Sequence, residues 1–116
     1  MPGPEKIYQD KLAQGIFEIQ RCASCRKHVF YPRVLCPHCG AAQLDWTAPS
    51  GHGTVYSTTV VRRKEADGGD YNVALIDLDE GPRLMSRVVA VAPGKVQIGM
   101  AVKAHVVDGV VEFTPR

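Results

Sequence analysis

From Thr54 onward, apolar and polar residues alternate with a period of two, which is typical of β-strands that bury one face. Turn-forming segments rich in glycine, proline and aspartate interrupt the alternation. The pattern predicts five strands, over residues 54–63, 71–79, 83–91, 101–107 and 110–114. The residues expected to face the interior are Ala74, Ile76, Leu78, Leu84, Ser86, Val88 and Val106.

Five short strands joined by short turns fit a small closed barrel of the oligonucleotide- or oligosaccharide-binding (OB) kind. The two-residue turn Asp108-Gly109 between valine-rich arms predicts a tight hairpin between the last two strands. An open meander or a small sandwich satisfies the same pattern. Closure is favoured because an open sheet would expose long valine-rich edges.

A helical period appears near the N-terminus, where Ile7, Tyr8 and Leu12 form an apolar stripe within residues 5–14. Gly15 follows in the position of a C-terminal stop. The stripe has two interpretations, which are packing against the rest of this chain and docking on a partner. Residues 16–21 then look extended.

A turn-rich break over residues 49–53 separates the barrel from what precedes it. We therefore expect three parts: a helix with a lead-in strand (residues 1–21), a cysteine-containing segment (22–48) and the barrel (49–116). Trp46, the only tryptophan of the chain, is expected to seal the seam between the second and third parts.

Length and composition narrow the class of protein. A chain of 116 residues suits one compact domain, or a small domain carrying a metal-held appendage. The net charge is +2, which is too balanced to predict the strongly basic face of a nucleic-acid-binding protein. No apolar run approaches the roughly 20 residues that span a bilayer, and no apolar signal segment opens the chain. We therefore expect a cytoplasmic protein without membrane contact.

The four cysteines form two pairs, Cys22-x-x-Cys25 and Cys36-x-x-Cys39, with ten residues between the pairs. Two such pairs facing each other across a hairpin place four thiolates at the corners of a tetrahedron, which is typical of a structural zinc site. A segment this short cannot bury a sufficient core, so metal binding is expected to supply most of its folding free energy. The segment Val29-Phe30-Tyr31-Pro32-Arg33, between the pairs, is expected to provide apolar cover for the metal, with Phe30 and Tyr31 in that cover rather than in a ligand platform.

Other uses of the cysteines are less consistent with the sequence. Disulfides belong to oxidising compartments, and a thioredoxin-like redox pair requires a βαβ pattern that is missing. Iron suits four thiolates as zinc does, so zinc is preferred without excluding iron. His28 and His38 could replace a sulfur but, with four cysteines present, are expected to be solvated loop residues.

The order of these parts resembles a family long catalogued as a domain of unknown function, the zinc-ribbon OB-fold proteins associated with acyl-CoA enzymes. The resemblance covers nearly the whole chain and implies a mostly β fold: a short N-terminal helix, a rubredoxin-like zinc ribbon and a five-stranded OB-fold barrel. The segments that carry it are Arg21-Cys22-x-x-Cys25, Phe30-Tyr31-Pro32-Arg33, Cys36-Pro37-x-Cys39-Gly40, Trp46, Gly51-His52-Gly53-Thr54-Val55-Tyr56-Ser57, Val73-Ala74-Leu75-Ile76-Asp77-Leu78 and Ile98-Gly99-Met100-Ala101-Val102.

The resemblance also implies a function. The chain would be a non-catalytic accessory subunit in a hetero-oligomer with a thiolase-like enzyme or an enoyl-CoA hydratase, stabilising that partner and helping to bind or channel the acyl-CoA. The alternative is a single-stranded nucleic-acid-binding OB-fold protein, in which Tyr56 and Tyr71 would stack on bases. The mixed charges of the second and third barrel strands argue against that alternative.

Arg62, Arg63 and Lys64 form the one basic cluster, at the expected end of the first barrel strand. These cations could hold the phosphates of coenzyme A through charge-assisted hydrogen bonds, or they are a solvated strand end. His52 and His105 lack an orienting carboxylate motif and are expected to be structural. Because every thiol is assigned to the metal, no catalytic residue is predicted.

Overall fold

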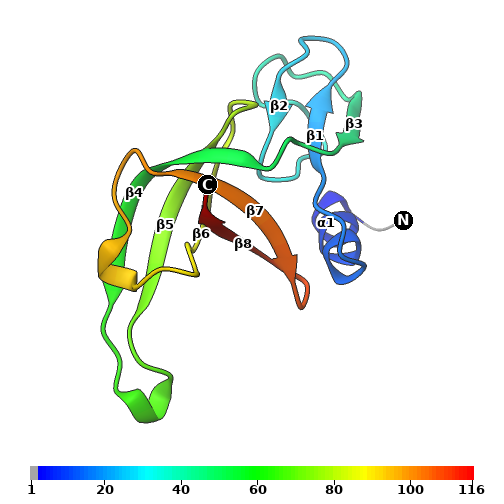
Figure 1. Cartoon of the computed structure of the whole chain (residues 1–116). Coiled ribbons are helices and arrows are strands. Elements are labelled where there is room, and N and C mark those ends of the chain that lie inside the picture. The colour runs from blue at the N-terminus through cyan, green and yellow to red at the C-terminus, as the bar shows by residue number, and fades with distance from the viewer. Residues whose placement is uncertain (1–2) are drawn as a thin grey trace.

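The computed structural model describes residues 3–116 and divides them into two sheets and one α-helix (Figure 1). A three-stranded sheet in the order β2-β1-β3 forms the ribbon, and a five-stranded sheet in the order β6-β5-β4-β7-β8 forms the barrel. The bounds are α1 Pro4–Ala13, β1 Ile19–Cys22, β2 His28–Val29, β3 Leu44–Thr47, β4 His52–Val61, β5 Tyr71–Leu78, β6 Arg83–Ser86, β7 Ala101–Val107 and β8 Val110–Pro115, with short 3-10 helices at Glu65–Asp67 and Pro93–Lys95.

The barrel closes where the chain leaves β6 and meets β8. Val88 and Phe113 form a parallel bridge, in which the Val89 amide donates to the Phe113 carbonyl over 2.7 Å and the Phe113 amide donates to the Arg87 carbonyl over 2.9 Å. The third barrel strand is therefore shorter than the predicted range 83–91, because the chain changes its pairing partner from β5 to β8 after Ser86. The closed OB-type barrel is confirmed.

The barrel interior contains the side chains that the alternation predicts. Ile76 and Phe113 are fully buried, and Ala74, Leu78, Leu84 and Val88 are each less than 5% exposed. Ser86 is half-buried and its hydroxyl donates to the Val111 carbonyl over 2.7 Å, while Val106 packs against the core.

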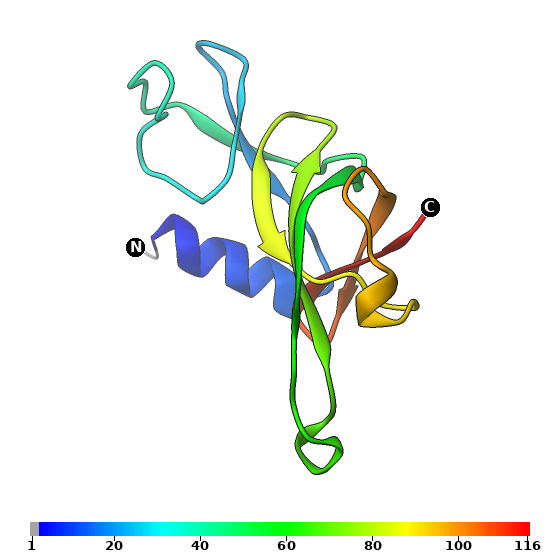
Figure 2. The same ribbon diagram turned by 90° about the vertical axis from the view of Figure 1, so that its left-hand side faces the viewer.

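The long strand β4 begins two residues earlier than predicted, at His52. Gly53 lies opposite Leu78 on one side and Val102 on the other. A Cβ atom at Gly53 would lie 2.8 Å from Ile76 Cγ2 and 2.9 Å from the Asp77 carbonyl oxygen, so only glycine allows the strands to approach this closely. Beyond the barrel, β4 and β5 continue as a projecting hairpin (Figure 2).

Helix α1 joins the ribbon to the barrel. Tyr8 and Leu12 are buried in the same core as the barrel residues, and the Tyr8 ring meets the Phe30 ring edge-on at 5.5 Å between centroids. Trp46 packs against this core, as expected for a residue at the seam. Two of the three stripe residues thus pack against their own chain, as the first interpretation predicts, while Ile7 is half-buried outside the core.

No helix among the described residues is long and apolar enough to cross a membrane.

Replacing Leu12 by alanine should lower the free energy of unfolding by about 2–5 kcal/mol, because a buried leucine at the seam leaves a cavity. Lys6→Ala, on the exposed side of the same helix, is the control and should change it by no more than about 0.5 kcal/mol. Urea unfolding followed by tryptophan fluorescence measures both. Equal stabilities of the two variants would show that the helix does not share the barrel core.

Candidate functional site

The four cysteines of the ribbon come together at one point. The Sγ atoms of Cys22 and Cys39 are 3.6 Å apart, those of Cys25 and Cys36 are 3.7 Å apart, and all four lie within 4.8 Å of one another. A tetrahedral ion with zinc–sulfur bonds of about 2.3 Å requires sulfur–sulfur separations of about 3.8 Å. The donor set therefore fits a four-coordinate structural zinc ion.

The two cysteine pairs adopt matching turns. The Arg26 amide donates to the Cys22 carbonyl and the Gly40 amide to the Cys36 carbonyl, both over 2.8 Å, and each turn ends in a left-handed residue. The backbone also supports the sulfur atoms, because the Cys25 amide donates to Cys22 Sγ over 3.4 Å. This backbone donor lowers the pKa of Cys22 to about 6, so its thiolate is the dominant form at neutral pH.

The apolar cover of the cysteine cluster agrees with the expectation at Val29 and differs from it at Phe30 and Tyr31. Val29, Ala41 and Leu44 pack around the buried Cys22 and Cys36. Phe30 instead packs into the main core against Tyr8, and Tyr31 is 62% exposed and stacks on Phe30. The expectation for these two aromatics was wrong: Val29 packs on the cysteines, whereas the Phe30 ring turns to the main core and the Tyr31 ring stacks on it at 4.9 Å between centroids.

The two histidines near the cysteines do not join the cluster. Within residues 3–116 the potential ligand atoms that lie together come from the cysteines alone. His38 is exposed and contributes its backbone amide, which donates to Cys36 Sγ over 3.4 Å.

The basic cluster of residues 62–64 lies just beyond the end of β4, in the turn of the projecting hairpin. Arg62 Nη1 lies 3.1 Å from Asp70 Oδ2, and the Arg63 guanidinium carbon lies 4.9 Å from the centre of the Tyr71 ring. The backbone amide of Arg63 also donates to Asp70 Oδ1 over 3.0 Å. Asp70 thus balances the charge of Arg62, and the contact with Tyr71 positions the Arg63 guanidinium. Lys64 is exposed.

The remaining histidines contact polar groups, and neither ring pairs with a carboxylate within residues 3–116. His52 Nδ1 lies 3.0 Å from Arg116 Nη1, and His105 Nε2 lies 2.9 Å from the Thr114 hydroxyl.

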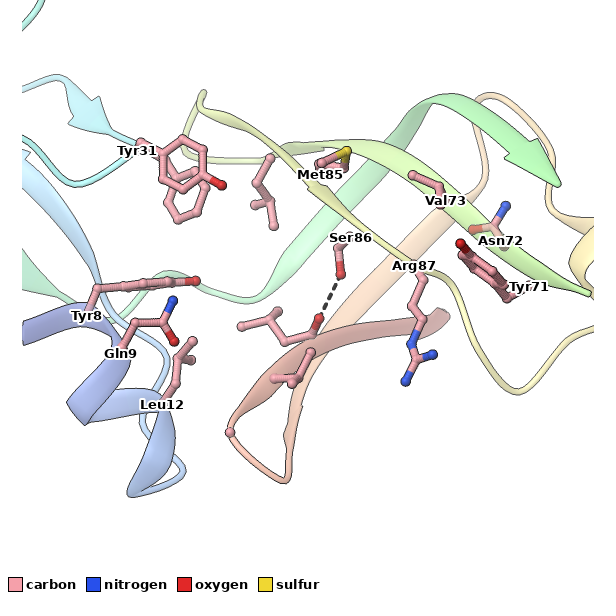
Figure 3. Close-up of a pocket in the computed structure, with 15 residues that line it drawn as sticks. Tyr8, Gln9, Leu12, Tyr31, Tyr71, Asn72, Val73, Met85, Ser86 and Arg87 are labelled. Atoms are coloured by element: carbon pink, nitrogen blue, oxygen red, sulfur yellow. Dashed lines mark hydrogen bonds between the residues drawn. The ribbon is translucent and has the colours of Figure 1, made fainter. Parts of the chain in front are cut away.

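A groove of about 440 Å³ lies between α1, the ribbon loop and the barrel (Figure 3). Tyr8, Gln9 and Leu12 reach it from the helix, Tyr31 from the ribbon, and β5, β6 and the β7–β8 turn form the opposite wall. Sequence reasoning missed this groove because its wall is assembled from five segments that are distant in the chain. The one local signal was Met85, an apolar residue on the exposed face of β6 between Arg83 and Arg87.

A ribbon with four converging cysteines, followed by a five-stranded barrel, defines the class of zinc-ribbon OB-fold proteins. Residues 9–45 match the family model of the ChsH2 rubredoxin-like zinc ribbon domain, and residues 46–107 match that of the ChsH2 C-terminal OB-fold domain. The chain belongs to this family.

Three relatives are informative. The chain is 42% identical over 86 residues to a probable enoyl-CoA hydratase alpha subunit of Thermomonospora curvata, covering 72% of this chain and 27% of that one. It is 35% identical over 88 residues to a DUF35 domain-containing scaffold protein of Methanocaldococcus jannaschii, covering 72% and 62% respectively. A solved chain of the Ltp2-ChsH2(DUF35) aldolase superposes with a TM-score of 0.82 at 32% identity, covering 99% of this chain and 96% of that one. The chain spans 27% and 62% of the two curated relatives named first, which is less than two thirds of the length of each.

Cys36→Ser should release the metal and unfold the ribbon, because a ligand is lost from a site that has few other stabilising contacts. Circular dichroism should still detect the barrel strands. Elemental analysis for zinc and iron gives the metal content directly, and His38→Ala, two residues away, should retain the full amount. Equal metal content in Cys36→Ser and the parent protein would contradict the four-cysteine site.

Proposed function

We propose that this protein is a non-catalytic accessory subunit of an acyl-CoA-processing complex. It stabilises a catalytic partner, such as a thiolase-like acyltransferase or aldolase or an enoyl-CoA hydratase, and helps to bind or channel the CoA ester. The observation that carries the proposal is the match over 99% of this chain and 96% of a solved chain that is described as part of an aldolase. Because the match is almost complete on both sides, the described residues of this chain have the same fold as that solved chain.

The chemistry of the side chains supports a non-catalytic role. All four thiols face one another in the ribbon, where a metal would use them. His52 and His105 are bonded to Arg116 and Thr114 rather than to a carboxylate that could orient an acid or a base. A structural zinc ion held by four sulfurs has no open position for a substrate.

The proposed contribution to CoA binding rests on the turn of the β4–β5 hairpin. Arg63 is stacked on Tyr71, a contact that leaves terminal guanidinium donors available, and Lys64 is exposed beside it. The hairpin projects from the barrel, so these cations can reach beyond the surface of this subunit (Figure 1). Charge-assisted bonds from them to CoA phosphates would complete a site whose acyl end lies in the partner.

Nucleic-acid binding is less compatible with the surface of the barrel. The Arg83 guanidinium carbon lies 3.3 Å from the centre of the Tyr56 ring, and Arg63 covers Tyr71. An arginine thus covers one face of each ring, and Arg83 is paired with Asp77 over 2.6 Å. Bases would have to displace these arginines or use the opposite ring faces, and the pairing of Arg83 with Asp77 interrupts a continuous positive groove.

Affinity purification of the tagged chain from its native cells tests the proposal. Mass spectrometry should identify a larger acyl-CoA enzyme in stoichiometric amounts, and the isolated chain should not convert acyl-CoA substrates. The tag alone is the control, and retention on heparin or single-stranded DNA is measured in parallel. Nucleic-acid retention without an enzyme partner, or turnover by the chain alone, would overturn the proposal.

In the purified complex, Arg63→Glu should raise the KM for the CoA ester by roughly tenfold, because it replaces a charge-assisted bond by repulsion. Lys103→Glu, an exposed change of the same charge on β7, is the matched control and should leave KM unchanged. Steady-state kinetics separate KM from kcat. If both variants behave alike, residues 62–64 are only a solvated turn.

A further inference from the structure

Strand β6 is the edge of the five-stranded sheet, and its backbone has one free side over part of its length. The Leu78 amide donates to the Pro82 carbonyl over 2.9 Å, and the register places Ile76 opposite Leu84 and Ala74 opposite Ser86. In an antiparallel ladder, hydrogen-bonded and non-hydrogen-bonded pairs alternate. Leu84 and Ser86 therefore bond to β5, while the amides and carbonyls of Arg83 and Met85 point away from it.

The same alternation explains how the barrel closes further along. Arg87 follows Met85 by two residues, and its outward carbonyl accepts from the Phe113 amide over 2.9 Å. Met85 and Arg83 have no such partner among residues 3–116, because β6 and β8 separate in this direction. At the point of separation the contact is made by a side chain, since the Ser86 hydroxyl reaches the Val111 carbonyl (Figure 3).

The groove lies along this open edge. Leu84, Leu12 and Val111 are buried apolar residues of its floor and walls, while Met85 and Tyr31 are more than 60% exposed. Arg87 is the single charged side chain that lines it, within the part of the chain the structure describes. Its Nε donates to Glu112 Oε2, which leaves the terminal nitrogens for another acceptor.

We propose that this edge receives an extended segment of the catalytic partner as an added β-strand, pairing with the backbone of Met85 and Arg83. Alternate apolar side chains of the segment would lie in the groove, and a carboxylate would lie at the Arg87 end. Unpaired backbone groups on an edge strand are a template for another extended chain, and the apolar groove beside them supplies side-chain specificity. An acyl chain would fill the groove without satisfying these backbone groups. The inference rests on the proposed function, because it requires a protein partner.

Hydrogen exchange in the reconstituted complex of this chain with its catalytic partner tests the inference. On binding, the amides of Met85 and Arg83 should exchange at least about tenfold more slowly, as expected for amides that enter a ladder. The amides of Leu84 and Ser86 are the internal controls and should be slow in both states, because β5 already bonds them. Butanoyl-CoA added to the isolated chain is the small-molecule control.

Met85→Pro removes the outward amide without breaking a bond to β5. Met85→Ala is the matched control, because it also loses the methionine side chain but keeps that amide. The proline variant should bind the partner at least about tenfold more weakly than the alanine variant. Proline removes one hydrogen bond to the added strand, and its ring keeps that strand from approaching β6 closely. Retained zinc and an unchanged urea midpoint confirm that each variant folds. If Met85→Pro does not fold, the exchange measurement decides without it.

The outcomes separate this inference from the proposed function. A partner that binds without protecting Met85 and Arg83 would overturn the added strand and leave the accessory role intact. Equal protection by butanoyl-CoA alone would make the groove a small-molecule site and would also overturn the added strand. If affinity purification finds no enzyme partner, both proposals fail together.

Discussion

The ribbon depends on its four converging sulfur atoms, because it has almost no hydrophobic core of its own. Its own buried cluster consists of Cys22, Val29 and Cys36, with Ala41 and Leu44 partly buried around them. This apolar area is too small to offset the conformational entropy of ordering the segment between residues 22 and 44. Coordination of a metal by the converging thiolates would supply the missing free energy, and the matching backbone turns place the sulfurs at the required separations.

The ribbon in turn determines where its loop meets the helix. Gln20, which is 3% exposed, donates to the Arg33 carbonyl over 2.8 Å and accepts from the Arg33 amide over 2.6 Å. These two bonds tie the segment that carries Phe30 and Tyr31 to β1. Phe30 then contacts Tyr8, and burial raises the pKa of Tyr8 to about 12, with a smaller contribution from Tyr31. Tyr8 therefore remains neutral in the groove wall over the whole physiological range.

The sequence predicted what depends on local pattern. Alternation located the barrel strands, and the spacing of the cysteines located the metal ligands, because both signals repeat over a few residues. It could not predict that β6 stops at Ser86, since that depends on the bridge between Val88 and Phe113, which are distant in the chain. The sequence also could not decide whether the helix packs on its own chain. It placed Phe30 at the metal site, whereas the ring packs on the main core.

The position of α1 explains why the barrel has an open edge without an open core. Where β6 and β8 separate, an uncovered barrel would expose Leu84 and Val111 to water. Tyr8 and Leu12 cover this opening from outside the sheet, so Leu84 and Val111 remain buried. The helix packs by side chains, however, and its own backbone bonds are internal, so it cannot pair with the backbone of Met85. Apolar burial is therefore complete within this chain, whereas the outward backbone groups of the exposed Met85 and Arg83 are left to water or to an added strand.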